Sequence, residues 1–299
     1  MITVDDLELL DTLIWVGSGE ECARRCFTNQ STVSRRNTTT LDFLGLKLER
    51  NAMSEWELCG DCGLLNMERK VHQYRRFSHK KEFLRLEATP WAGPTLATAA
   101  PQNWTQGTWN HVGMQRPLYL LKNRIIDAWI GSYQPDMPDK QNPDFLVIDL
   151  CQTPVNLCAN QGHPLIKKEK VTREDLDDFP SLALPSGFFP KTERILRSHG
   201  LWSTSARMKK YKPEKWEGRT KDNSTLCYAT CLGLEIMTEL EKINYDLGLL
   251  SGESLVVLRE FANEKRILQL LKNLGHRVME KSRMHPDLTP CFDSTSAFD

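Results

Sequence analysis

The sequence predicts an α/β fold preceded by a separate helical domain, and three observations support this prediction. Apolar residues recur at helical spacing through the N-terminal part of the chain. From residue 84 onwards, short runs of strand character alternate with helical patterns. A chain of 299 residues, of which 40% are hydrophobic, is long enough to bury more than one domain core.

The first 58 residues predict three helices. Apolar residues recur at helical spacing within residues 3–16, and acidic residues occupy the first turns of this segment, as the helix dipole favours. Ser18 is a suitable N-cap for a second helix, and Asn29 for a third helix that starts at Gln30. Two such helices joined by a short turn are typical of a helix-turn-helix, whose second helix enters the major groove of DNA.

The order and spacing of residues in this segment resemble the N-terminal winged helix-turn-helix of LysR-type transcriptional regulators. The resemblance rests on Gly17-Ser18, Ala23-Arg24-Arg25, Gln30-Ser31, Val33-Ser34-Arg35-Arg36 and Leu44-Gly45, followed by Leu48 and Arg50. It implies a DNA-binding domain over residues 1–58 and double-stranded DNA as a partner. The residues expected to contact DNA are Gln30, Ser31, Ser34, Arg35, Arg36 and the wing residue Arg50.

Residues 59–83 are predicted to form a linker helix that pairs two subunits. Leu64, Met67, Val71 and Tyr74 fall at a and d positions over two heptads, and basic residues occupy many of the others. In the family that the chain resembles, a linker helix here joins two subunits, which implies a homodimer or a homotetramer. The alternative is a basic helix packed on the surface of its own domain.

Residues 84–282 are predicted to form an α/β domain. We expect strands at 83–88, 145–150, 155–159, 247–250 and 254–258, helices at 225–240 and 261–281, and a helix, turn and strand over 118–131. Gly162-His163-Pro164-Leu165 and the segments after it resemble the effector domain of the same regulators. This resemblance implies two α/β lobes of the periplasmic-binding-protein type, with an abridged lobe I because residues 94–117 are few for the helix and strand expected there.

The lobe boundaries follow from where the chain is expected to cross between lobes, near 155–162 and 251–256. We assign lobe I to residues 84–157 and 255–282, and lobe II to residues 158–254. Residues 283–299 contain Pro, Ser, Asp and Thr and are predicted to be a flexible tail.

Three strand ends in this domain carry small polar residues, and the resemblance assigns these ends to an effector cleft. Open α/β sheets bind ligands beyond the carboxyl ends of their strands. The predicted ligand-binding residues are Thr89, Pro90, Trp91, Gly131, Ser132, Ser186 and Gly187. No Lys or Arg falls at these ends, so we expect a polar, weakly anionic small molecule. Alternatively, these segments are ordinary turns beside a closed, unliganded cleft.

Catalytic motifs are missing from the sequence. It has no G-x-S-x-G elbow, Walker loop or G-x-G-x-x-G, and its seven histidines show no metal-ligand spacing. We therefore expect no enzymatic activity, no cofactor and no metal. Cys59-Gly60-Asp61-Cys62 has the spacing of half a zinc site or of a redox pair, but we interpret it as an inert loop pair, and Cys22, Cys26, Cys227 and Cys231 as core residues.

The sequence as a whole favours a cytoplasmic, ligand-responsive transcription regulator, since it has no membrane-spanning run and no basic secretory signal. RNA polymerase is a further candidate partner. Two alternatives remain open. Six basic and ten acidic residues in 1–58, together with polar Asn37 and Thr40 on the inner helix face, suggest a small-molecule-binding protein that no longer binds DNA. Cys59 and Cys62 suggest a redox- or metal-responsive regulator.

Overall fold

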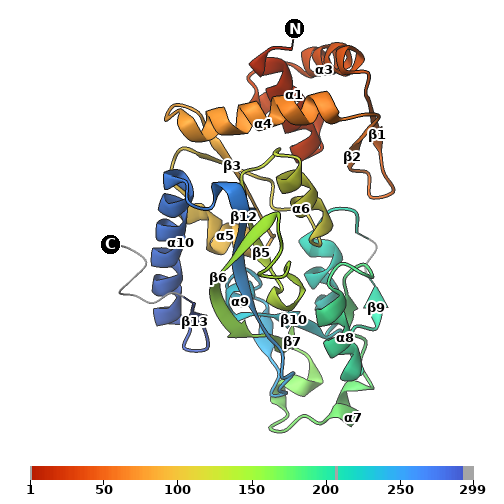
Figure 1. Ribbon diagram of the computed structural model, residues 1–299. Coiled ribbons are helices and arrows are strands. Elements are labelled where there is room, and N and C mark those ends of the chain that lie inside the picture. The colour runs from red at the N-terminus through yellow and green to blue at the C-terminus, as the bar shows by residue number, and fades with distance from the viewer. Residues whose placement is uncertain (1, 206–207, 292–299) are drawn as a thin grey trace. The chain divides into compact units, whose positions relative to one another are not determined.

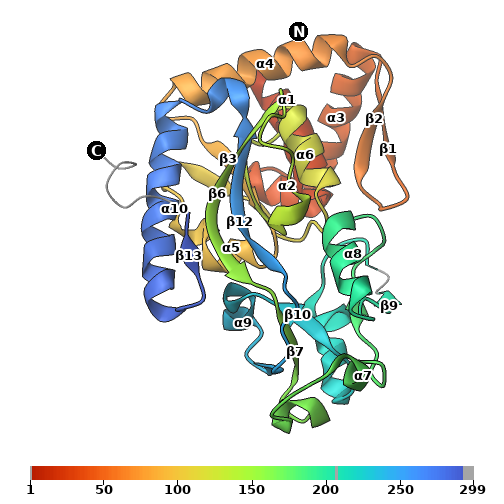
Figure 2. The same ribbon diagram turned by 60° about the horizontal axis from the view of Figure 1, so that its bottom comes forward.

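The structure is a computed structural model that describes residues 2–205 and 208–291 (Figures 1 and 2). Over these residues the chain divides into two compact units. The first comprises Met1–Glu87, Gln102–Thr108 and Leu118–Ala128, and the second comprises Ala88–Pro101, Trp109–Pro117 and Trp129–Asp299. Two segments of the first unit therefore come from the part of the sequence predicted to be the α/β domain.

The first unit begins with the three predicted helices, which are α1 (Val4–Val16), α2 (Gly19–Arg25) and α3 (Gln30–Leu44). Both predicted N-caps are confirmed. The Ser18 hydroxyl accepts a hydrogen bond from the Glu21 N–H, and the Asn29 side chain accepts one from the Thr32 N–H. These bonds satisfy amide groups that have no partner inside the helix, so local chemistry fixes where α2 and α3 begin.

The inner face of α3 is only partly apolar. Val33 and Leu41 are buried there, but so are the polar residues Asn37 and Thr40. Among the described residues, neither polar side-chain atom of Asn37 has a hydrogen-bond partner. An amide buried without partners costs about 1–3 kcal/mol, so Asn37 weakens the packing of α3.

A hairpin and a long helix follow α3. The strands β1 (Lys47–Arg50) and β2 (Trp56–Cys59) pair antiparallel, and α4 (Gly63–Ser78) comes next. The predicted linker helix is present but ends at Ser78, because the backbone of His79 is extended (φ −105°, ψ 117°).

The inner face of α4 is charged and buried. Arg69 donates hydrogen bonds from Nε and Nη2 to Oδ1 of Asp11 on α1, at 2.8 and 2.7 Å. Arg76 donates to both carboxylate oxygens of Asp127, at 2.8 and 3.0 Å. The Gln73 amide also donates to Asp127, at 2.9 Å. Side chains that would normally face water therefore hold α4 in place through paired charges.

Arg85 extends this buried group. Its backbone N–H donates to Asp127 at 2.9 Å, and its guanidinium pairs with Glu8 on α1. Burial by itself would raise the pKa of Glu8, but the charges of Arg85 and Arg76, together with hydrogen bonds from Arg85 and Thr12, keep that pKa below its usual value. Glu8 is thus an ionised partner of Arg85 rather than a free acid.

A short parallel pair of strands completes the first unit, with β3 (Leu84–Ala88) beside β4 (Trp104–Gln106). The segment 94–117, expected to be abridged, contains β4, the end of the short helix α5 (Ala92–Thr95) and the start of α6 (Gln115–Lys122).

The larger sheet of the second unit is built around β12 (Leu250–Leu258). This strand pairs antiparallel with β5 (Ala128–Ser132) on one side and with β6 (Phe145–Pro154) on the other, and β13 (Thr289–Pro290) pairs with β6. The helix α10 (Lys265–Met284) runs beside β6 and β13 and buries Ile267, Leu270, Leu274 and Val278 (Figures 1 and 2). No helix among the described residues combines the length and apolarity needed to cross a membrane.

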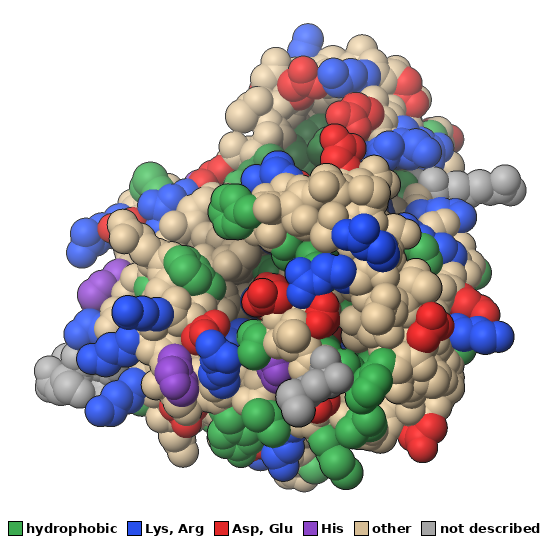
Figure 3. Space-filling view, turned by 90° about the horizontal axis from the view of Figure 1, so that it is seen from above, with side chains coloured by type: hydrophobic (Ala, Val, Ile, Leu, Met, Phe, Trp, Pro, Cys, Tyr) green, Lys and Arg blue, Asp and Glu red, His purple; other side chains and the backbone are tan. Residues whose placement is uncertain are grey.

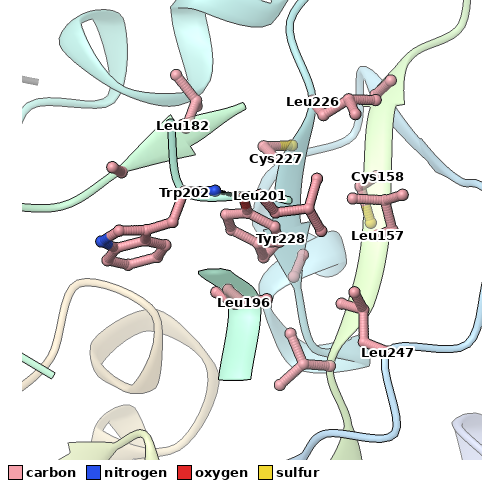
Figure 4. Packing of buried hydrophobic residues seen from close by; sticks show 14 of the residues in the cluster. Leu157, Cys158, Leu182, Leu196, Leu201, Trp202, Leu226, Cys227, Tyr228 and Leu247 are labelled. Atoms are coloured by element: carbon pink, nitrogen blue, oxygen red, sulfur yellow. Dashed lines mark hydrogen bonds between the residues drawn. The ribbon is translucent and has the colours of Figure 1, made fainter. Parts of the chain in front are cut away.

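A second, smaller sheet has the order β10-β7-β11, with β7 (Asn156–Asn160) between β10 (Cys227–Ala229) and β11 (Leu240–Lys242). The other elements of this region are α7 (Arg173–Leu176), β8 (Leu182–Ala183), α8 (Pro190–Ser198), β9 (Thr204–Ser205) and α9 (Cys231–Ile236). Figure 4 shows Leu157, Leu226 and Tyr228 in the buried hydrophobic cluster on which these strands and helices pack. The Tyr228 hydroxyl accepts a hydrogen bond from the Trp202 N–H at 2.9 Å.

The prediction of a single helix over residues 225–240 is wrong. The structure has β10, α9 and β11 in its place, because Thr230 caps α9 by accepting a hydrogen bond from the Gly233 N–H. A strand predicted at 247–250 is also wrong, since β12 starts only at Leu250 and Gly248 before it has a left-handed backbone (φ +56°).

The chain passes between the two sheets at Val155 and again between Lys242 and Leu250. The first passage agrees with the prediction, whereas the second comes earlier than the predicted 251–256, which instead lie in β12. The predicted tail also differs, because α10 continues to Met284 and β13 is paired. Its residues 292–299 lie outside the described part of the chain.

We predict that Asp11→Ala destabilises the protein by about 3–5 kcal/mol, because it leaves the buried Arg69 charge without its partner. Urea unfolding followed by circular dichroism measures the change. Asp42→Ala, which removes an exposed acid from α3, should alter stability by less than about 0.5 kcal/mol. Equal stabilities of the two variants would show that the buried pair does not hold α4.

Replacing Asn37 with Leu should increase the free energy of unfolding by about 1–3 kcal/mol, because it removes an unpaired buried amide. The same urea experiment measures it, with the exposed Asn66→Leu change as a control. A lower stability for Asn37→Leu would mean that the amide has partners in solution.

Candidate functional site

The second unit contains a small pocket of about 30 Å³ that is open to solvent. It lies beside both passages of the chain between the two sheets, where β5 ends, β12 begins and β10 leads into α9. Its lining residues are Trp91, Ser132, Tyr133, Val155, Tyr228, Ala229, Thr230, Gly233, Met237, Ser251 and Glu253. Pockets that bury drug-sized ligands are at least roughly ten times larger, so a ligand of this pocket must be small.

A chain of hydrogen bonds leads to the carboxyl group of Glu253. The Ser132 hydroxyl donates to Oε2 of Glu253 at 2.5 Å, and the Thr89 hydroxyl lies 2.7 Å from that of Ser132. A hydroxyl has one hydrogen to donate, so Thr89 must donate to Ser132 whenever Ser132 donates to Glu253. The Ala92 N–H in turn donates to Thr89 at 3.2 Å. The end of β5 and the start of α5 thus jointly orient Glu253.

Glu253 is 1% exposed, and burial raises the pKa of its carboxyl to about 7, although the Ser132 hydrogen bond opposes the shift. The register between β6 and β12 shifts between Glu253 and Ser254, and such irregularities can redirect a side chain. Only glycine fits at the preceding position, Gly252, because a Cβ atom there would lie 2.0 Å from the Cys151 carbonyl oxygen.

Aromatic rings form one wall of the pocket. The rings of Trp91 and Tyr133 meet edge to face at 5.6 Å, and Tyr133 stacks on Phe189 at 4.1 Å. Tyr133 holds a left-handed backbone (φ 67°), a conformation that costs a bulky residue energy and is concentrated at functional sites. These contacts fix the rings before any ligand arrives.

A second acid lies behind Trp91. Oε1 of Glu217 accepts hydrogen bonds from Trp91 Nε1, at 3.3 Å, and from the Tyr211 hydroxyl. Its other oxygen is buried without a partner among the described residues, and burial raises the pKa of this carboxyl. Sequence reasoning missed both acids. Glu253 could have been found from the sequence, because it lies just before the apolar run of β12. Glu217 could not, because it lies in a polar stretch with no hydrophobic periodicity.

The structure brings three of the predicted ligand residues together, because Trp91 and Ser132 line the pocket and Thr89 contacts Ser132. Pro90 and Gly131 are their neighbours in the chain and do not line it. Ser186 and Gly187 are also absent from the lining, and the Gly187 carbonyl accepts a hydrogen bond from Gln115. The expected weakly anionic ligand stays a prediction, although the ionised form of a buried carboxyl group in the pocket would repel an anion.

The residues predicted to contact DNA differ in their exposure and in their contacts within the protein. Gln30, Ser31, Ser34 and Arg35 are exposed near the start of α3. Arg36 instead pairs with Asp6 on α1 at 2.7 Å.

Arg50 also has partners within the first unit. Its guanidinium lies 3.7 Å from the ring centre of Trp56, and it donates a hydrogen bond to the Gly17 carbonyl at 2.9 Å. Lys and Arg side chains are interspersed with Asp and Glu on the face drawn in Figure 3. Of the three predicted arginines, Arg35 is the exposed one whose guanidinium shows neither an ion pair nor a hydrogen bond among the described residues.

The four predicted pairing residues form the α4 seam, which we define as Leu64, Met67, Val71 and Tyr74. Their exposed fractions are 51%, 69%, 66% and 45%. Because the opposite face of α4 is the charged buried one, these apolar residues remain on the surface of the chain.

The cysteine sites predicted from sequence gain no further ligands. No third Cys, His, Asp or Glu joins Cys59 and Cys62 within the described residues. The structure instead groups Cys231, His285 and Asp287 within 4.8 Å. All three already have protein partners. Cys231 Sγ lies 3.4 Å from the Thr153 hydroxyl, His285 contacts Glu235 at 2.6 Å, and Asp287 pairs with Lys242 at 2.8 Å.

Comparison with known proteins gives the same architecture. Residues 110–208 match the family model of the LysR substrate binding domain. Comparison with curated protein sequences gives no match.

Solved structures of full-length regulators are similar along nearly the whole chain. Full-length OxyR from Pseudomonas aeruginosa is 16% identical, with a TM-score of 0.55 over 92% of this chain and 95% of its own. ArgP from Mycobacterium tuberculosis is 11% identical, with a TM-score of 0.53 over 93% and 97%. Full-length CbnR, solved in complex with its target DNA, is 12% identical, with a TM-score of 0.51 over 92% and 100%. The chain thus has the fold of full-length LysR-type transcriptional regulators, in which an N-terminal helical region and a linker helix precede an α/β domain, and residues 110–208 match the substrate binding domain of that family.

Proposed function

We propose that this protein binds double-stranded DNA through α3 and that a small molecule in the pocket of the second unit controls that binding. The exposed row of Gln30, Ser31, Ser34 and Arg35 supports the first part most directly. These side chains lie at the N-terminal end of the second helix of a helix-turn-helix, the position from which such helices contact base edges. CbnR, with the same fold, was solved on its target DNA.

The α4 seam supports a dimer. Exposed apolar residues at a and d positions are the surface from which two helices form a coiled coil. Pairing through α4 would give the assembly two copies of α3, and a two-fold assembly matches a palindromic site. A homotetramer would be a pair of such dimers.

The pocket supports control by a small molecule rather than catalysis. It combines aromatic walls with a few oriented polar groups, which is the usual composition of a ligand site. LysR-type regulators are transcription factors rather than enzymes, and the chain has their fold.

A small-molecule-binding protein without DNA affinity is the second candidate. The acidic balance of residues 1–58 and the internal contacts of Arg36 and Arg50 favour it, because few cations remain to meet phosphates. A gel shift with the DNA upstream of the protein's own gene separates the two candidates.

Arg35→Ala should weaken specific DNA binding by about 1–3 kcal/mol, or roughly 5- to 150-fold, if Arg35 contacts a guanine. Fluorescence anisotropy with a labelled duplex from the upstream region measures the affinity. Arg24→Ala removes an exposed arginine that pairs with Glu21 on α2, and it should have a much smaller effect. Unchanged affinity in folded Arg35→Ala protein would reject the proposed contact.

Val71→Asp should shift the protein towards monomers, because it places a charge in the α4 seam. Sedimentation equilibrium measures the mass. Asn66→Asp adds a charge at an exposed position of α4 outside the seam and should leave the mass unchanged. If Val71→Asp sediments with the mass of the unmodified protein, subunits do not pair through this seam.

A further inference from the structure

We propose that the pocket takes a small molecule bearing a protonated amine, with the ammonium group bound by the Glu253 carboxylate beside the rings of Trp91, Tyr133 and Tyr228. Only the regulatory role of this ligand rests on the proposed function. Binding itself is a property of the pocket and can be measured without DNA.

The charge of the lining is the first argument. Among the described residues that line the pocket, Glu253 is an acid and none is Lys or Arg. Its carboxyl accepts one described side-chain hydrogen bond, from Ser132, and no cation offsets its burial. A buried carboxylate needs an opposite charge and several donors to be stable. An ammonium group supplies one positive charge and up to three N–H donors.

The aromatic wall is the second, independent argument. Cations bind over the faces of Trp and Tyr rings because these faces carry partial negative charge, and contacts shielded from water are worth about 2 kcal/mol. Trp91, Tyr133 and Tyr228 all line the pocket. Trp91 is held edge to face against Tyr211 and Trp216, at 5.3 and 5.9 Å, so its ring is positioned in advance.

Glu217 adds to the preference for a cation. It lies behind Trp91, with one carboxylate oxygen buried and unpartnered among the described residues. An anionic ligand would be repelled by Glu253 in the lining and by Glu217 across Trp91, whereas a cationic one reduces the cost of ionising both. This second acid is why we infer a cation rather than a neutral polar molecule.

The same geometry predicts how binding depends on pH. The Glu253 carboxyl has a pKa of about 7 in the free pocket, so it is largely protonated at pH 6 and largely ionised at pH 8. An ammonium ligand requires the ionised form, and its affinity should therefore rise roughly tenfold between these values.

Apart from Glu217, the titratable groups described around Glu253 are ones whose pKa is raised further above this range. Burial raises the pKa of Tyr133 and Tyr228 above their usual values, and likewise that of the Cys151 thiol on β6. Glu217 also has a raised pKa, so its contribution has to be separated by mutation.

The test uses the full chain without DNA and three probes of equal shape, namely cyclohexylammonium, cyclohexanecarboxylate and cyclohexanol. Ligand-observed NMR titration at pH 8 and pH 6 measures each affinity. We expect cyclohexylammonium to bind at least roughly tenfold more tightly than the other two at pH 8. Equal affinities, tighter binding of the carboxylate, or no binding of the amine at millimolar concentrations would overturn the proposal.

Three variants identify the group responsible. Glu253→Gln keeps the size of the side chain but should weaken amine binding by roughly 30-fold or more and remove its pH dependence. Glu217→Gln should weaken binding less and keep the pH dependence. Glu241→Gln, at an exposed position of β11, is the matched control and should change neither property.

A fourth variant gives a readout that loss of folding cannot imitate. The Ser132 hydrogen bond lowers the pKa of Glu253, so Ser132→Ala should move the midpoint of the binding profile to higher pH. A midpoint that stays in place, or amine binding that persists in folded Glu253→Gln protein, would contradict the assignment. Loss of DNA binding alone would count against the proposed function and leave this result intact.

Discussion

The first unit depends on the pairing of buried charges beneath α4. A guanidinium can be buried only where carboxylates meet its N–H groups, so Arg69 and Arg76 must face Asp11 and Asp127. This requirement fixes the rotation of α4 about its own axis. An ordinary surface helix buries its apolar stripe, whereas this rotation leaves the α4 seam exposed. The exposed seam is therefore a consequence of the charged contact, and it is the surface from which we infer a dimer.

The buried acid Glu253 of the second unit has no arginine partner among the described residues. Asp11 and Asp127 each have arginine partners, whereas Glu253 is bound by a single hydroxyl and faces a pocket. A buried carboxyl without a counter-charge holds its proton to higher pH, and its ionised form is stable only when a counter-charge is supplied. The simplest physical account is that a ligand supplies that charge. The contrast between the two sites separates acids that stabilise the fold from an acid that serves binding.

Local sequence rules predicted the helices of the first unit well. Ser18 and Asn29 cap helices through bonds to residues three positions away, and such signals are complete within a short window. The same rules failed over 225–240, where apolar spacing suited a helix but the cap at Thr230 starts a much shorter one.

The candidate site was harder to predict because its parts are distant in the sequence. Thr89, Ser132 and Glu253 meet through tertiary pairing of β5 with β12, which no local pattern encodes. Strand ends still identified Thr89, Trp91 and Ser132, because ligand sites recur there. Buried acids such as Glu217 cannot be told from surface acids by sequence alone, since their burial depends on what packs over them.

The central claim is that this chain occupies specific sites on DNA as a dimer, and genome-wide mapping of its positions on DNA tests this most directly. The account predicts a limited set of sites, each with two related half-sites separated by about one helical turn or a multiple of it. A map without enriched sites, from cells in which the protein is present and folded, would contradict the claim.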